Sequence, residues 1–267
     1  DFQAPASAEL LLADLEKSGE AEQVSAVTKV DESLLECWPR DWLPHDLSGN
    51  PRILSLGYEM YLSKWQGDTL PLEVQAEELL QKLRLARVGD RPVIFITHSF
   101  GGLLVKQFLL YARDNPVCRS ILKNTKGVVF FSTPHRGADM SRYADAYVFR
   151  RSRALDVLQP SNDYLLQLHA RFGVLARDIP TLSFGENSNT CYETRLGRIF
   201  FQLVSDESSN PSFPAGEHSF YKLDYNHYES CKPRSPTDSR YTILLRFIRQ
   251  QLKNNSTLEK TQSKKSL

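Results

Sequence analysis

The sequence predicts an α/β fold in which helices cover both faces of a parallel sheet, giving three layers. Two continuous apolar runs, over residues 91–97 and 127–132, are typical of strands that are buried on both faces. A helical pattern over residues 101–111 lies between them. Strand, helix and strand in this order form a parallel pair joined by a right-handed crossover.

The other elements follow in chain order. A short amphipathic stretch surrounds Trp38, and residues 51–59 alternate like a strand. Residues 72–86 carry apolar side chains at helical spacing, and Gly89 stops that pattern. The remaining predictions are two strands and a closing amphipathic helix, over residues 180–184, 198–204 and 240–252.

Composition excludes several classes of protein. Of the 267 residues, 41% are hydrophobic and 24% are charged, which is ordinary globular usage. The longest apolar runs fall far short of the roughly 20 residues of a membrane-spanning helix. The four cysteines are widely spaced, so we expect neither a zinc site nor a disulfide framework, and no cofactor or metal. The net charge is +1 and no basic stripe stands out, so we expect no nucleic-acid partner.

Three segments differ in character. Residues 1–36 hold nine acidic residues against two lysines and form an acidic segment that we expect to be helical and partly disordered. Residues 37–252 form the α/β domain, in which residues 138–178 are a cap-like helical insertion. Residues 253–267 are polar and without aromatic side chains, and we expect a disordered tail. No charged stretch followed by an apolar one is visible near residue 1, so we expect no secretory signal.

Ser99 lies on the turn between the strand at residues 91–97 and the following helix. A serine on such a turn projects outward beside the free N–H groups of the helix, as the nucleophile of an α/β-hydrolase does. Gly101 and Gly102 let the helix and strand approach closely, whereas Thr97 stands where such turns commonly have glycine and crowds the turn. The alternative is that Ser99 merely caps the helix.

A serine hydroxyl needs a base to take its proton. The chain order serine, acid, histidine that is typical of α/β-hydrolases selects His227, which follows the predicted strands and precedes the last helix. His135 falls in the wrong chain order, and His98 is expected to point away from the turn and act as a packing residue.

The acid of such a site lies at the carboxyl end of a strand, where the loops converge on the nucleophile. Glu186 ends the strand predicted at residues 180–184 and is the first candidate. Glu207 follows the next predicted strand and is the alternative acid. A carboxylate at a strand end is also common as a solvated turn residue.

The motifs THSFGGLLVK, FFSTPHRG, LSFGE and YNHYESCKP, together with CWPRDWLP and VGDRPV, resemble the serine-active-site-containing protein 1 family over residues 37–250. That family belongs to the α/β-hydrolases, near the lipases and the glycosylphosphatidylinositol deacylases. The resemblance implies Ser99 as nucleophile, His227 as base and Glu186 as acid. It further implies a serine esterase or acyltransferase of phospholipid remodelling and cholesterol handling, inside the cell at contacts between mitochondria and endoplasmic reticulum.

Hydrolases of this type carry an early His-Gly loop that supplies half of the oxyanion hole, the pair of N–H donors for the negative oxygen of the transition state. Upstream of Cys37 the sequence contains neither a histidine nor an apolar strand. We therefore expect the N-terminal strands to be missing, the Phe100 N–H to be the remaining donor, and the activity of this chain to be weak or absent.

The cap-like insertion contains Arg150, Arg151 and Arg153 beside aromatic residues. Arginine forks of this kind bind phosphate, so these residues could meet an anionic lipid headgroup in a peripheral membrane contact. The alternative is an ordinary solvated basic face. Two functions follow: acyl transfer from a lipid or other acyl ester, or lipid binding or scaffolding by a domain that kept the fold without the activity.

Overall fold

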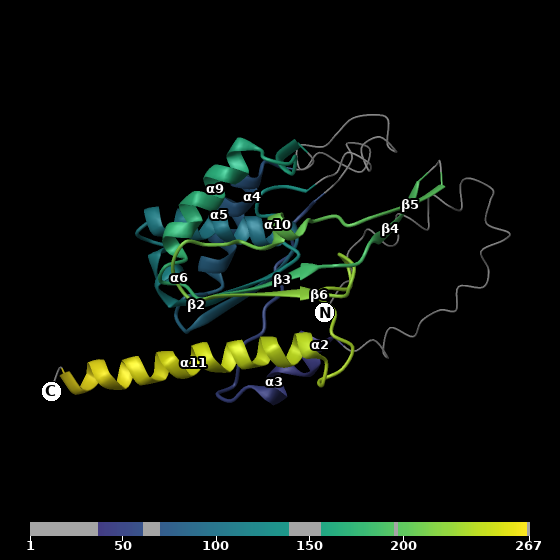
Figure 1. Ribbon diagram of the computed structural model, residues 1–267. Helices are drawn as coiled ribbons and strands as arrows, with labels where there is room; N and C mark the ends of the chain where they lie inside the picture. Colours follow the sequence, from purple (N-terminus) through teal and green to yellow (C-terminus); the bar gives the residue numbers. More distant parts are fainter. Residues whose placement is uncertain (1–36, 61–69, 139–155, 195–196, 266–267) are drawn as a thin grey trace, which may run out of the picture. The chain divides into compact units, whose positions relative to one another are not determined.

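The computed structural model describes residues 37–60, 70–138, 156–194 and 197–265, and the elements named here lie in the compact unit Trp38–Leu267 (Figure 1). The helices are α2 (Trp38–Asp41), α3 (Leu43–Asp46), α4 (Leu72–Leu85), α5 (Phe100–Asp114), α6 (Arg119–Asn124), α9 (Asp163–Leu175), α10 (Asp206–Ser209) and α11 (Ser239–Lys265). The strands are β1 (Val93–His98), β2 (Thr125–Phe131), β3 (Thr181–Glu186), β4 (Thr190–Thr194), β5 (Gly197–Phe201) and β6 (His218–Leu223).

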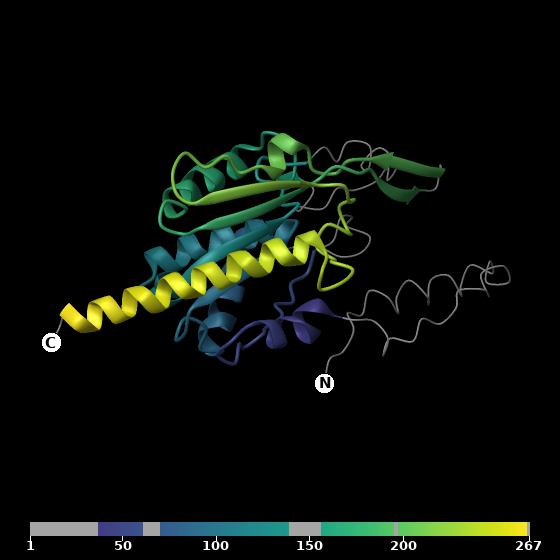
Figure 2. The ribbon, with the colours of Figure 1, turned by 60° about the horizontal axis from the view of Figure 1, so that its bottom comes forward.

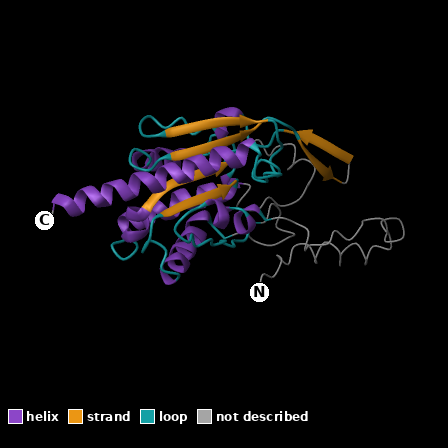
Figure 3. Cartoon of the chain, turned by 90° about the horizontal axis from the view of Figure 1, so that it is seen from below, coloured by secondary structure: helices purple, strands orange, loops and turns teal. Residues whose placement is uncertain are grey.

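Four parallel strands form the central sheet in the order β1-β2-β3-β6 (Figure 3). Since all four strands run the same way, their carboxyl ends meet at one edge. Ser99 follows β1 at that edge, Glu186 ends β3, and the loop that contains His227 follows β6. The topology therefore gathers segments that are far apart in the sequence.

The two faces of the sheet pack against different helices (Figures 1 and 2). Along β2, Val128 and Phe130 point into a core with α4, α5 and α9, whereas Val129 and Phe131 point into a second core with α11, α2 and α3. All four side chains are essentially fully buried. This alternation is what a strand covered on both faces requires, and the predicted three-layer α/β fold is confirmed.

The predicted strand over residues 51–59 is wrong, because that segment has no regular secondary structure. None of the described strands pairs with it, so its backbone N–H and C=O groups form no hydrogen bonds to a neighbouring strand of the sheet. Ile53 and Leu54 are 40% and 46% exposed, while Leu56 and Met60 pack against the core that contains α5.

The prediction for residues 198–204 is right in type but wrong in place. β5 pairs antiparallel with β4 in a separate hairpin beyond the carboxyl ends of the sheet strands (Figure 3). The fourth sheet strand is instead β6, which the sequence analysis missed. β6 is an edge strand with mostly exposed or half-buried side chains, so it lacks the apolar run that marks β1 and β2.

The last helix is longer than predicted. α11 continues from Ser239 to Lys265, so the expectation of a disordered tail after Leu252 is wrong for those residues. Residues 253–265 contain neither proline nor glycine, and nothing in their composition breaks a helix that is already nucleated. No helix among the described residues is both long and apolar enough to cross a membrane.

Candidate active site

Ser99 sits on a strained turn. β1 ends at His98 and α5 begins at Phe100, and Ser99 between them has a φ of 52° and a ψ of −125°. Its N–H donates to the carbonyl of Phe131, at 2.8 Å, which ties the turn to the end of β2. The Ser99 side chain makes no capping hydrogen bond to α5, so the alternative of a plain helix cap is wrong. Strain of this kind persists only where the surrounding structure imposes it.

The close approach of α5 to β2 depends on Gly102. A Cβ atom at Gly102 would lie 2.2 Å from Thr133 Oγ1 and 2.9 Å from Phe130 Cδ1, so no larger residue fits there. Thr97, which stands in place of the common glycine, is accommodated because its buried hydroxyl donates to the carbonyl of Val129 at 2.8 Å. The turn therefore tolerates a β-branched residue before Ser99.

His227 lies between Ser99 and Glu186. Its Nε2 is 2.9 Å from Ser99 Oγ, and its Nδ1 is 2.6 Å from Glu186 Oε2. The side chains of His227 and Glu186 are 3% and 0% exposed. Because a carboxylate only accepts, Nδ1 carries the proton in the neutral imidazole and Nε2 is left to accept one from the serine hydroxyl. The structure thus brings together Ser99, His227 and Glu186, the first of the two candidate acids.

The second oxygen of Glu186 is held as well. Oε1 accepts from the N–H groups of Leu203, at 2.6 Å, and Val204, at 3.0 Å, so the buried carboxylate is hydrogen-bonded at both oxygens. Glu207 lies instead on α10 and is exposed. The carboxylate that the structure brings to His227 is therefore Glu186, and Glu207 is not at this site.

Phe100 is the first residue of α5, so its N–H belongs to the unpaired donors of the helix N-terminus beside Ser99. Its role as an oxyanion donor stays a prediction. The three arginines of the insertion, Arg150, Arg151 and Arg153, lie outside the described residues.

The expectation that His98 points away from the site is wrong. Its Nε2 lies 2.9 Å from the carbonyl oxygen of His227, and the two imidazole rings are 4.8 Å apart. Sequence spacing gave no signal for this contact, because it joins the end of β1 to a loop 129 residues further along the chain.

A second group of titratable side chains lies around Lys106, about two helical turns after Ser99 on α5. Lys106 and His135 are both 0% exposed, and Lys106 Nζ lies 3.1 Å from His169 Nδ1. Burial lowers the pKa of Lys106 and His135 well below their usual values and lowers the pKa of His169 to about 3. Burial and the neighbouring positive charges shift all three pKa values in the same direction, towards the neutral form.

We expect His169→Gln to reduce the loss of stability in acid. The unfolded chain protonates His169 below its ordinary pKa of 6.5, whereas the folded chain does so only near pH 3, so wild-type stability falls as the pH drops across that window. Glutamine does not titrate and still offers Lys106 an acceptor. Urea unfolding at pH 7 and pH 4 should show a smaller decrease in the free energy of unfolding for His169→Gln, and an equal decrease would contradict this account.

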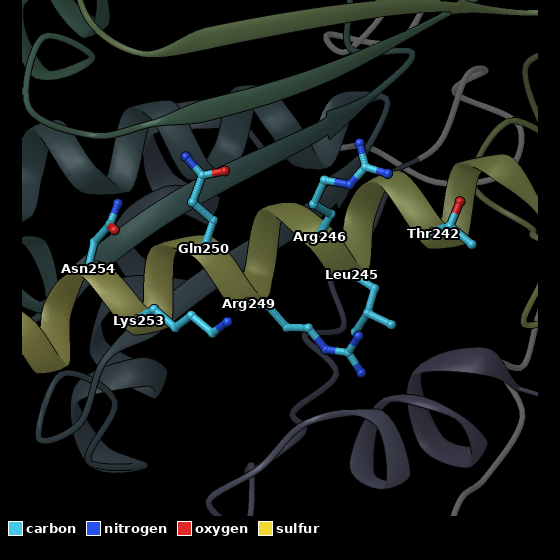
Figure 4. Close-up of a pocket in the computed structure, with 7 residues that line it drawn as sticks. All are labelled: Thr242, Leu245, Arg246, Arg249, Gln250, Lys253 and Asn254. Atoms are coloured by element: carbon cyan, nitrogen blue, oxygen red, sulfur yellow. The ribbon is translucent and has the colours of Figure 1, made fainter.

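The described surface also contains a hollow of about 560 Å³ along α11 (Figure 4). Its lining comes from α11 alone: Thr242, Leu245, Arg246, Arg249, Gln250, Lys253 and Asn254. It includes none of the residues around Ser99, so we assign it no part in their chemistry. Within the described residues, no group of three or more histidine, cysteine or acidic side chains could hold a metal ion.

A parallel sheet covered on both faces, with a serine, a histidine and a glutamate in contact at its carboxyl edge, defines a domain of the α/β-hydrolase type. The chain is 36% identical to protein SERAC1 of Danio rerio over 233 residues, which cover 84% of this chain and 34% of that protein. It is 35% identical to protein SERAC1 of Homo sapiens over 226 residues, covering 81% and 33% respectively. The chain belongs to the SERAC1 family and spans about a third of the length of these relatives.

No protein-family model matches the chain. Among solved structures it is similar to Bacillus licheniformis lipase BlEst2, with 15% identity and a TM-score of 0.48, covering 67% of this chain and 76% of that one. It is also similar to phospholipase PlaB from Legionella pneumophila, with 15% identity and a TM-score of 0.49, covering 75% and 51%. Both scores are under 0.5, so the fold assignment depends on the sheet and on the turn at Ser99 instead.

Proposed function

We propose that this domain transfers the acyl group of an ester through Ser99. The observation that carries the proposal is the continuous hydrogen-bonded series from Ser99 Oγ through the His227 imidazole to the buried Glu186 carboxylate, with contacts of 2.9 and 2.6 Å. Nucleophile, base and orienting acid in this arrangement are what a serine needs in order to react at neutral pH.

In the proposed reaction, Ser99 Oγ attacks the ester carbonyl carbon as its proton passes to Nε2 of His227. The tetrahedral oxyanion meets the Phe100 N–H, and its collapse expels the alcohol, which takes the proton back from His227. The acyl group is then bonded to Ser99. Water or a lysophospholipid hydroxyl attacks this acyl-enzyme in the same way, which regenerates the serine and completes hydrolysis or acyl transfer respectively.

The proposed substrate class is a lipid acyl ester, probed first with a short-chain ester. Half-exposed aromatic rings stand beside the triad: Tyr228 lies 5.6 Å from the ring of His227, and the Tyr58 hydroxyl approaches Gly101 in the first turn of α5. The faces of such rings can contact an acyl chain, which supports an acyl-ester substrate. The phospholipid headgroup, the peripheral membrane contact of the insertion and the location at contacts between mitochondria and endoplasmic reticulum stay predictions from the family resemblance.

A fluorophosphonate probe tests the proposal directly, because it bonds only to a serine that a base has activated. We expect labelling of the wild-type chain at Ser99 and none in Ser99→Ala. Turnover of a short acyl ester should depend on Ser99 in the same way. A folded chain that the probe leaves unlabelled would overturn the proposal and favour the lipid-binding or scaffolding alternative.

A further inference from the structure

We propose that His98 is a positioning residue for the catalytic base, acting through a hydrogen bond from its Nε2–H to the carbonyl oxygen of His227. The inference rests on the proposed function, because it concerns the residue that would serve as base there. The contact is 2.9 Å long and joins the residue directly before the nucleophile to the backbone of the base.

His98 is one of two donors on that carbonyl. The Ser230 hydroxyl also donates to the His227 carbonyl, at 2.9 Å, and itself accepts from the hydroxyl of Ser132, at 3.0 Å. On the other side, the N–H of His227 donates to Thr190 Oγ1, at 3.1 Å. Both peptide groups that flank the Cα of His227 are therefore fixed, and the imidazole turns only about its side-chain bonds.

The tautomer of His98 follows from its partner. A carbonyl oxygen only accepts, so Nε2 carries the proton and Nδ1 is bare in the neutral ring. Burial, with a smaller contribution from the neighbouring His227, lowers the pKa of His98 to about 4. His98 is thus neutral near pH 7, and no second imidazolium lies 4.8 Å from the ring of His227 when that ring takes up the serine proton.

Positioning at this level matters for the rate. A proton transfer needs Nε2 of His227 and Oγ of Ser99 at hydrogen-bond distance, and a misplacement of about 1 Å can cost about 10²-fold. His98 and Ser99 are consecutive residues of one turn. The hydrogen bond from His98 therefore fixes the position of His227 directly with respect to the nucleophile Ser99.

Two substitutions that differ by one methylene group test this. In His98→Gln the amide nitrogen reaches the position of Nε2 and can still donate to the carbonyl, whereas in His98→Asn it stops short. We expect His98→Gln to be labelled by a fluorophosphonate within about threefold of the wild-type rate and His98→Asn to be slower by about 10- to 100-fold. Melting temperatures of both variants show whether the fold is intact.

A second readout does not depend on turnover. The proton between His227 Nδ1 and Glu186 lies in a short hydrogen bond of 2.6 Å, and we expect it to give a far-downfield proton NMR signal. We expect that signal to persist in His98→Gln and to broaden or disappear, through faster exchange with water, in His98→Asn. Ser230→Ala removes the other donor to the His227 carbonyl and should weaken the signal too, which gives the test a second, independent variant.

The two proposals fail in different ways. An unchanged downfield signal and an unchanged labelling rate in a folded His98→Asn would overturn the positioning role of His98 while leaving Ser99 chemistry intact. A wild-type chain that is never labelled, but whose signal is lost in His98→Asn, would overturn the proposed function while leaving the positioning role in place.

Discussion

Glu186→Gln is expected to slow fluorophosphonate labelling of Ser99 by about 10³–10⁴-fold. In the wild-type chain the carboxylate of Glu186 faces the Nδ1 proton of His227 at 2.6 Å, which leaves Nε2 free to accept from Ser99. An amide in its place can present its own N–H to Nδ1, which favours the tautomer with the proton on Nε2. A base that already carries a proton at Nε2 cannot take one from the serine.

The substitution is a fair test because it disturbs little else. Oε1 of the side chain, which accepts from the backbone of Leu203 and Val204, exists in glutamine too, so the fold around β3 should survive. Glu207→Gln is the matched control, since Glu207 is an exposed carboxylate on α10, and its labelling rate should equal that of the wild type. Equal labelling of Glu186→Gln and the wild type, or an equal loss in Glu207→Gln, would exclude Glu186 as the orienting acid.

The sequence was sufficient to predict those elements whose burial produces a recognisable apolar pattern along the chain. β1 and β2 are covered on both faces, so their continuous apolar runs identified them, and the helix between them fixed the parallel crossover. Ser99, Glu186 and His227 follow from this topology, because the carboxyl ends of parallel strands meet at one edge of the sheet. Chain order then selected His227 for Ser99, 128 positions away, whereas the strand end favoured Glu186 and left Glu207 as the alternative acid.

The sequence was insufficient where the conformation of a segment depends on the distant segment that it pairs with or contacts. Residues 51–59 alternate like a strand, but a strand exists only if another pairs with it, and none of the described ones does. β6 carries no apolar run because it lies at the sheet edge, and its place beside β3 comes from the backbone ladder. The contact of His98 with His227 depends on the path of a long loop, which no local pattern encodes.

Arg240→Met is expected to lower the free energy of unfolding by about 3–5 kcal/mol, the cost of breaking a buried ion pair by removal of one partner. The guanidinium of Arg240 is fully buried and binds both carboxylate oxygens of Asp238, whose side chain is 7% exposed. It also donates to the carbonyl of Glu229, at 2.5 Å, and lies 3.6 Å from the ring centroid of Tyr225. Methionine fills part of the space but leaves the Asp238 carboxylate without its cation.

Arg234→Met is the matched control. Arg234 contacts the same two neighbours, Glu229 at 3.4 Å and the ring of Tyr225 at 5.6 Å, but its side chain is 69% exposed. An exposed pair contributes about 0–1 kcal/mol, so this variant should unfold at nearly the wild-type urea concentration. A loss of similar size in both arginine variants would show that burial of Arg240 is not the cause.

The loop that Arg240 anchors is the one that carries His227, so the same substitution should also slow labelling of Ser99. Unfolding measured at low pH distinguishes the contribution of the Arg240–Asp238 ion pair to stability from the contribution of packing. Hydrogen bonds from Arg240 lower the pKa of Asp238 from 3.8 to about 2, so the stabilisation by this pair is complete above pH 3.8 and is lost as the pH falls through about 2. The difference in unfolding free energy between wild type and Arg240→Met should therefore shrink across that window, whereas a difference caused by lost packing alone would stay constant.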